Sequence, residues 1–262
     1  MISGSWLPEG WSKTTVLIEE CRLEDSEKKY FSVGTGFLID YQLRNILVTC
    51  KHIVEGKKYL YTAFNLKDGN ITRRSLESIK SMFEVDWVFH KNEDIAMIIF
   101  GIDTEKDDLL RIPNDLIEDF KNTEIGDDIF FLGYPLGIKP LKKFDPLVRA
   151  GIISMKEEKD FVIIEGNAFP GSSGSPVFLK PSIFNLKAKT IGQIRDAKFI
   201  GMLTGYIPYT DVAISQQTGK PRLIFEENSG LAKVLSTNLI REIFEYDSFK
   251  KYIDKLKVQT NP

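Results

Sequence analysis

Short apolar segments separated by charged or glycine-bearing turns make up most of the chain, and this pattern constrains its fold most strongly. Eleven or more segments have the length, alternation and β-branched or aromatic content of strands, among them TTVLIEE, SVGTGFLID, NILVTCKHI, DIAMIIF, DIFFLGYP and KFIGMLTGYI. Helical spacing is found at 113–122 and in a tail that begins near Ser236. The pattern predicts an all-β protein, built as barrels or a sandwich, with a C-terminal helix.

Composition narrows the classes of partner. The net charge is −2, with 35 basic and 37 acidic residues, and no clustered basic surface suggests a nucleic-acid partner. No apolar run reaches the roughly 18–20 residues that cross a bilayer, so no membrane partner is expected. The N-terminus lacks the pattern of a secretory signal, and two cysteines cannot form a disulfide framework. We expect a cytoplasmic protein.

Two histidines and two cysteines also limit the cofactors that the chain can hold. With only these few residues of the types that bind zinc, a dedicated structural zinc site is not expected, and no other cofactor is expected. His52 follows an apolar strand, and His90 lies in the polar connection VFHKNED, where a surface position is expected.

The stretch GNAFPGSSGSPVF (166–178) is the strongest candidate for chemistry. A serine hydroxyl becomes a nucleophile when an imidazole takes its proton and a carboxylate orients that imidazole. Glycines beside the serine allow backbone N–H groups to point at a developing oxyanion. Ser173 is the predicted nucleophile, and the amides of Gly171 and Ser173 are the predicted oxyanion hole. A plain glycine-serine turn is the alternative.

The order of residues excludes one well-known serine hydrolase arrangement. The G-x-S-x-G elbow of α/β-hydrolases requires a histidine after the serine, and none follows Ser173. The remaining order is His52, Asp94, Ser173, in which His52 is the base and Asp94 orients it. Asp86, which also flanks a strand, is the alternative to Asp94.

These residues resemble the motifs of trypsin-like serine proteases with the chymotrypsin fold, and they are most similar to the bacterial HtrA-type branch. VTCKHIV resembles the histidine motif, NEDIAMIIF the aspartate motif and PGSSGSPVF the serine motif. The resemblance implies two six-stranded antiparallel β-barrels with the site between them. Residues 1–122 would form the first barrel, 123–235 the second, and 236–262 a helical tail without a following PDZ domain.

The resemblance also implies how a substrate would bind. Strand residues Leu203, Thr204, Gly205 and Tyr206 would pair with the substrate backbone, and Asn167 would lie near the base of the specificity pocket. Thr204 would support the triad aspartate through its hydroxyl. Ser175 replaces the second glycine of the serine motif.

The implied activity is serine endopeptidase activity on protein or peptide substrates. A catalytically silent fold that binds peptides is the alternative, and an enzyme activated by a regulatory protein partner is a third possibility. The sequence leaves the oligomeric state open.

Overall fold

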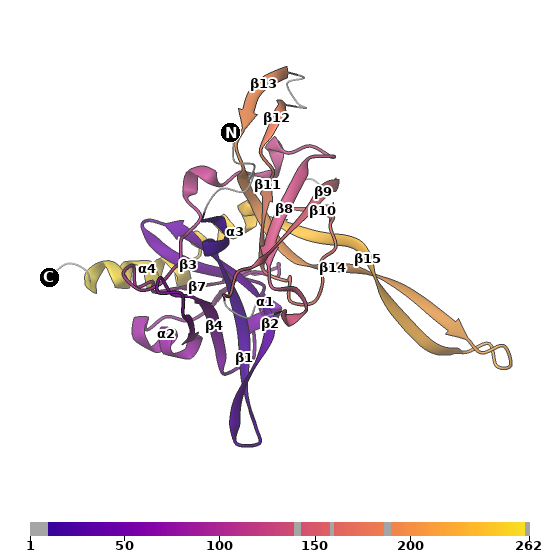
Figure 1. Ribbon diagram of the computed structural model, residues 1–262, viewed down its shortest axis with the longest axis horizontal. Helices are drawn as coiled ribbons and strands as arrows, with labels where there is room; N and C mark the ends of the chain where they lie inside the picture. The colour runs from indigo at the N-terminus through magenta and orange to yellow at the C-terminus, as the bar shows by residue number, and fades with distance from the viewer. Residues whose placement is uncertain (1–9, 139–142, 158–159, 186–189, 260–262) are drawn as a thin grey trace.

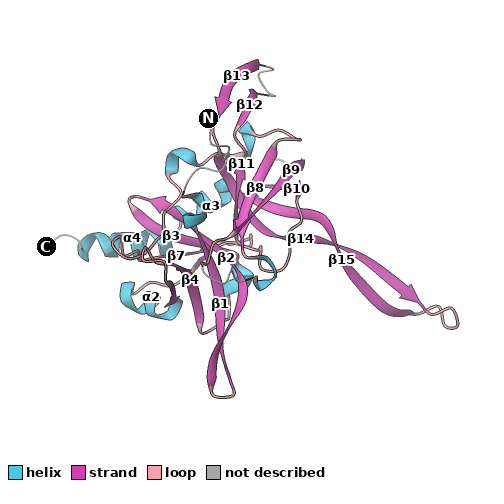
Figure 2. Ribbon diagram, viewed as in Figure 1, coloured by secondary structure: helices cyan, strands magenta, loops and turns pink. Residues whose placement is uncertain are grey.

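A computed structural model describes residues 10–138, 143–157, 160–185 and 190–259. Two large antiparallel sheets lie side by side, and helices flank the first of them (Figure 1). Strands dominate the molecule, as Figure 2 shows by colour. The predicted all-β fold is therefore confirmed. The ends of the predicted units, residues 1–9 and 260–262, lie outside the described residues.

The first sheet is formed by the N-terminal part of the chain. It has seven strands in the order β5-β4-β1-β2-β3-β7-β6. The bounds are β1 Thr15–Glu24, β2 Glu27–Tyr41, β3 Arg44–Thr49, β4 Leu60–Asn65, β5 Ile71–Ser75, β6 Val88–Phe89 and β7 Ala96–Ile99. β7 is buried along its whole length, which explains its uninterrupted apolar run.

The second sheet closes on itself as a six-stranded barrel in the order β10-β15-β14-β11-β8-β9. The bounds are β8 Asp128–Gly133, β9 Leu147–Glu157, β10 Phe161–Glu165, β11 Ser175–Leu179, β14 Lys198–Ile214 and β15 Pro221–Ser236. β12 (Ser182–Asn185) and β13 (Thr190–Arg195) form a separate two-stranded sheet. The predicted division at residues 122 and 123 lies between the two large sheets.

The helices differ from the expectation in two places. Residues 113–122 form two short 3-10 helices, Asn114–Leu116 and Phe120–Asn122, in place of one helix. The C-terminal tail forms two α-helices, α3 (Thr237–Phe244) and α4 (Asp247–Gln259). Ser236 caps α3 by accepting a hydrogen bond from the Asn238 N–H. The remaining helices are α1 Lys51–Val54, α2 Leu76–Phe83, and 3-10 turns at Trp11–Thr14 and Pro135–Gly137.

One apolar cluster joins the two halves of the molecule. Phe178 of β11 stacks on Phe130 at 5.1 Å between ring centroids and also contacts Phe199 and Trp11. Phe199 in turn meets Phe37 of the first sheet at 5.1 Å. Truncation of a fully buried phenylalanine costs about 3–5 kcal/mol, so this contact holds the sheets in a fixed relation.

β14 and β15 continue past the barrel as a long two-stranded ribbon, the orange and yellow arm that projects from the body in Figure 1. β15 was not predicted as a strand. Its outer part carries three consecutive exposed apolar residues, Leu223, Ile224 and Phe225, and therefore lacks the alternation of apolar and polar residues that marks a half-buried strand. Among the described helices, none combines the length and apolar character that a membrane crossing requires.

Candidate active site

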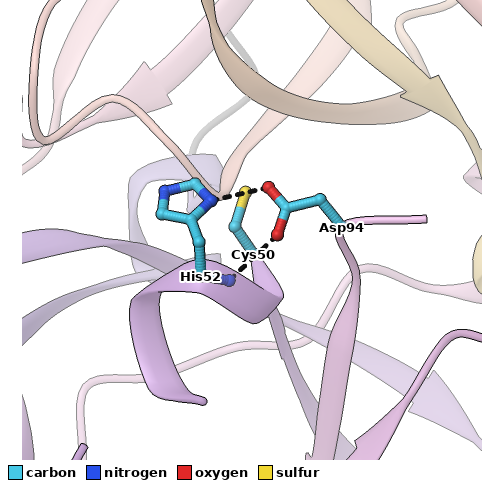
Figure 3. Close-up of side chains that lie close together, drawn as sticks. All are labelled: Cys50, His52 and Asp94. Atoms are coloured by element: carbon cyan, nitrogen blue, oxygen red, sulfur yellow. Dashed lines mark hydrogen bonds and ion pairs between the residues drawn. The ribbon is translucent and has the colours of Figure 1, made fainter. Parts of the chain in front are cut away.

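His52 lies at the point where β3 ends and the chain turns into α1. Cys50 precedes the helix in an extended conformation, and α1 is a single turn of four residues. Nδ1 of His52 lies 2.6 Å from Oδ2 of Asp94, and the His52 backbone N–H donates to Oδ1 of Asp94 at 2.9 Å (Figure 3). This two-point contact orients the imidazole. It also places the ring proton on Nδ1, which leaves Nε2 free to act as a base.

Asp94 lies in the short connection before β7 and accepts both of these hydrogen bonds from His52. Burial alone would raise the pKa of its carboxyl, but the hydrogen bonds from the His52 side chain and backbone outweigh burial and hold that pKa below its ordinary value. Asp94 is therefore ionised at neutral pH. Asp86, the alternative candidate, is exposed and pairs with Lys80 at 3.0 Å. The structure brings Asp94, and not Asp86, to His52.

His90 is buried, contrary to the expected surface position. Only 4% of it is exposed. Its Nδ1 accepts hydrogen bonds from the backbone N–H groups of Asn92 and Glu93, and its Nε2 lies 3.1 Å from Glu242 of α3. His90 thus shapes the loop that ends at Asp94 and ties it to the C-terminal helix. Sequence reasoning missed this role because Glu242 lies 152 residues further along the chain.

Ser173 lies in a tight turn that is fixed against the first sheet. Its carbonyl oxygen accepts a hydrogen bond from the Thr35 N–H at 2.9 Å, and the next N–H, of Gly174, donates to the Leu203 carbonyl at 2.8 Å. Thr49, three residues before His52, donates its hydroxyl to the Thr35 carbonyl at 2.7 Å. The serine turn and the histidine are therefore joined through one threonine of β2.

Ser173 makes no side-chain hydrogen bond to His52 within the described part of the chain. The structure thus pairs His52 with Asp94 directly and places Ser173 through its backbone. Hydrogen bonds between catalytic groups are commonly longer without substrate than with it.

Gly171 opens the same turn with a φ of +94°, a conformation that favours glycine. Its carbonyl accepts the Thr35 hydroxyl at 2.8 Å, and an added β-carbon would overlap the Tyr134 carbonyl. The N–H groups of Gly171 and Ser173 have no acceptor among the described residues. Two free amides beside a serine are the arrangement that an oxyanion hole requires.

Ser175 fits because its neighbour leaves room for it. The side chain is fully buried and faces Gly133 of β8, where an added β-carbon would overlap the Ser175 hydroxyl. That hydroxyl has no hydrogen-bond partner in the described residues. A serine is thus accommodated sterically at this position without making a polar contact.

The predicted substrate strand is part of β14. Gly205 and Tyr206 pair with Lys233 and Ala232 of β15 on one side. On the other side, β11 pairs with β14 only as far as Leu203. The β14 edge beyond Leu203 is therefore unpaired among the described residues, and an extended peptide can add to such an edge.

The hydroxyl of Thr204 does not reach the triad. It donates to the Lys233 carbonyl at 3.3 Å, so its expected support of Asp94 is not observed. The thiol of Cys50 lies beside Asp94 instead (Figure 3). Its Sγ lies 3.6 Å from the Leu203 carbonyl. Burial and the charge of Asp94 raise the pKa of this thiol well above its ordinary value.

Asn167 lines a cleft of about 540 Å³ together with Gly166, Asn228, Ser229 and Gly230. Asn228 holds this wall by donating its side-chain amide to the Ala168 carbonyl. Neither Ser173 nor the strand 203–206 is among the residues that line this cleft. The role of Asn167 at the pocket base stays a prediction.

Cys50, His52 and Asp94 are also the set with metal-ligand chemistry in the described chain, since their ligand atoms lie within 4.8 Å of one another. Ligands on a tetrahedral zinc ion lie about 3.3 Å apart. The 2.6 Å between Nδ1 and Oδ2 is shorter than that, and the raised pKa keeps the thiol protonated. The geometry suits a hydrogen-bonded pair better than a metal centre.

Comparisons with known proteins bear on the family and the fold. The family model of the trypsin-like peptidase domain matches residues 34–181, which is more than half of the 262 residues. The fold is similar to that of the HtrA-type protease AlgW, solved with a decapeptide, at a TM-score of 0.51 and 16% identity. The match covers 90% of this chain and 64% of that one, so this chain spans less than two thirds of its length.

A search of curated proteins found no match to the sequence. The structural neighbour supports the chymotrypsin-type arrangement of two sheets. In this chain the second sheet is closed as a barrel of six strands, as expected, whereas the first sheet has seven strands where six were expected. The family model covers His52, Asp94 and the turn at Ser173. The chain belongs to the trypsin-like peptidase family.

Proposed function

We propose that the protein is a serine endopeptidase that uses Ser173 as nucleophile, His52 as general base and acid, and Asp94 to orient His52. The observation that carries the proposal is the two-point contact of Asp94 with the Nδ1 and backbone N–H of His52. It leaves Nε2 as the free base.

In the proposed reaction, Ser173 Oγ attacks the scissile carbonyl carbon as its proton moves to Nε2 of His52. The amides of Gly171 and Ser173 stabilise the oxyanion that forms. The C–N bond then breaks as His52 returns the proton to the leaving amine. Water, activated by His52, hydrolyses the acyl ester and regenerates Ser173.

The unpaired edge of β14 supports a protein or peptide substrate. Residues Thr204–Tyr206 would bind its backbone by strand addition, which brings the scissile bond alongside the Ser173 turn. The decapeptide in the AlgW structure is in keeping with this class of ligand.

Hydrolysis of a peptide library by purified protein tests the proposal. Ser173→Ala and His52→Ala should each lower kcat by about 10⁶-fold, and both together should cost little more than either alone. Ser175→Ala is the matched control, because its hydroxyl is buried without a partner in the described residues. We expect that control to keep its activity and to be no less stable.

A second candidate is a peptide-binding module or a partner-activated enzyme. The β14 edge beyond Leu203, unpaired among the described residues, favours peptide binding, because strand addition requires no hydrolysis. Peptide binding without hydrolysis by the folded protein would support the module and contradict the proposed enzyme. Hydrolysis that requires an added protein would support partner activation.

A further inference from the structure

The thiol of Cys50 has no part in the proposed reaction, although it lies beside the Asp94 carboxyl. Cys50 is completely buried. Its Sγ, a ring nitrogen of His52 and a carboxylate oxygen of Asp94 all lie within 4.8 Å of one another, as Figure 3 shows. Cys50 is also the N-cap residue of α1, where a polar side chain usually bonds the first helical N–H groups. Among the described residues it makes no such bond, so its side chain is available to Asp94.

The hydroxyl that was expected to support Asp94 belongs to an irregular position of β14. The register between β14 and β15 shifts between Leu203 and Gly205, which leaves Thr204 without a register partner, as in a β-bulge. Bulges re-aim side chains, and the Thr204 hydroxyl donates to the Lys233 carbonyl. Within the described chain, β14 therefore gives Asp94 no side-chain donor, and the thiol is the remaining group beside the carboxylate.

A thiol has one proton to donate, and two kinds of acceptor lie near that of Cys50. The carbonyl oxygens of Leu203 and Thr204 lie 3.6 and 3.9 Å from its Sγ. The Leu203 carbonyl already accepts the Gly174 N–H at 2.8 Å. Asp94 is ionised, and a hydrogen bond to a charged acceptor is about twice as strong as one between neutral groups. The carboxylate is therefore the preferred acceptor, and a bond from Cys50 is among those that lower the pKa of Asp94.

We propose that Cys50 is a positioning residue, whose S–H donates to Asp94 and holds the carboxylate in the orientation that bonds His52 at two points. A carboxylate has about four sites for donors, so two bonds from His52 leave it able to tilt, and a third bond restricts that tilt. The third donor comes from the residue that opens α1, two positions before His52. The inference rests on the proposed function, because Asp94 needs this orientation for His52 to act as a base.

The infrared band of the S–H stretch tests the contact without any substrate. The chain has two cysteines, so Cys21→Ala leaves Cys50 as the sole source of the band. In that variant the band should have the low frequency of a thiol bonded to a carboxylate. Addition of Asp94→Asn should move it to higher frequency, because a neutral amide is a weaker acceptor. A band that does not respond to Asp94→Asn means that the thiol donates to β14, which overturns the proposal.

Peptide hydrolysis tests the role of the contact. Cys50→Ala should lower kcat about tenfold, as the loss of one hydrogen bond to a charged group predicts. KM should stay unchanged, because the substrate binds along β14. Cys50→Ser keeps a donor and should be several-fold faster than Cys50→Ala. Cys21→Ala and Cys21→Ser, the same changes at the other cysteine, are the matched controls and should hydrolyse like the wild type.

Thermal unfolding of each variant separates positioning from packing. Full activity in Cys50→Ala overturns the proposal. Equal losses in Cys50→Ala and Cys50→Ser at equal stability also overturn it, because a donor then makes no difference. If the wild type hydrolyses no peptide, the proposed function fails, whereas the infrared band still decides whether the thiol donates to Asp94.

Discussion

The contact between the Ser173 turn and the first sheet predicts that Gly174 cannot be replaced. Gly174 has a φ of +85°. A β-carbon added there would overlap the Thr35 carbonyl oxygen and lie 2.7 Å from Thr49 Oγ1 and 3.0 Å from the Thr35 carbonyl carbon. Two of these three atoms are backbone atoms of β2, so they cannot rotate away. Gly174→Ala must therefore shift the turn or the sheet.

Two costs add to give the expected loss of stability. A left-handed backbone costs a residue with a side chain about 1–2 kcal/mol. Insertion of a methyl group into a well-packed site costs about 1–3 kcal/mol. Gly174→Ala should thus lower the free energy of unfolding by about 2–5 kcal/mol. Gly126→Ala separates the two costs, because Gly126 has a φ of +90° and nothing within 4 Å of an added β-carbon.

Urea unfolding of both variants, followed by tryptophan fluorescence, measures these costs. Gly126→Ala should lose only the backbone part, about 1–2 kcal/mol. Peptide hydrolysis by the folded fraction of Gly174→Ala should also be slower, since any shift of the turn moves Ser173 relative to His52. If the two variants unfold at the same urea concentration, the turn is not held against β2 and the reasoning is refuted.

Three further predictions concern residues around the triad. Alkylation followed by mass spectrometry should modify Cys21 before Cys50, because the raised pKa of Cys50 means that its reactive thiolate forms only at higher pH. Equal rates for the two cysteines would contradict the burial of Cys50. His90→Phe should cost about 1–3 kcal/mol of stability and slow hydrolysis, while His90→Asn, which keeps an acceptor for the loop N–H groups, should cost less; equal losses would argue against the loop contact. The lowered pKa of Asp94 means that its carboxylate stabilises the fold above its unfolded value of about 3.9 and loses that effect as pH falls through the lower folded value. The stability difference between wild type and Asp94→Asn should therefore shrink from neutral pH toward pH 3, and a constant difference would contradict the shift.

Local patterns predicted much of the fold because alternating or continuous short apolar runs mark the strands of this chain. DIAMIIF and SPVFL become the fully buried β7 and β11, as continuous apolar runs suggest. The pairing of His52 with Asp94 followed from motif order, and the structure brings the two together across 42 residues.

Contacts between distant residues explain what the sequence did not predict. His90 is buried and its Nε2 lies 3.1 Å from Glu242, which is 152 residues further along the chain. The hydroxyl of Thr204 has the right position in the chain but turns to Lys233 of the adjacent strand. The outer part of β15 was not predicted because its apolar residues Leu223, Ile224 and Phe225 are consecutive and exposed, so no alternation marks the strand.

Labelling with a fluorophosphonate probe, located by peptide mass spectrometry, tests the central claim most directly. The proposed mechanism predicts covalent modification at Ser173 alone. The rate should fall sharply in His52→Ala and Asp94→Ala, and should stay unchanged in Ser175→Ala. Folded protein that remains unlabelled, or labelling at Ser173 that persists without His52, would contradict a serine nucleophile activated by the His52–Asp94 pair.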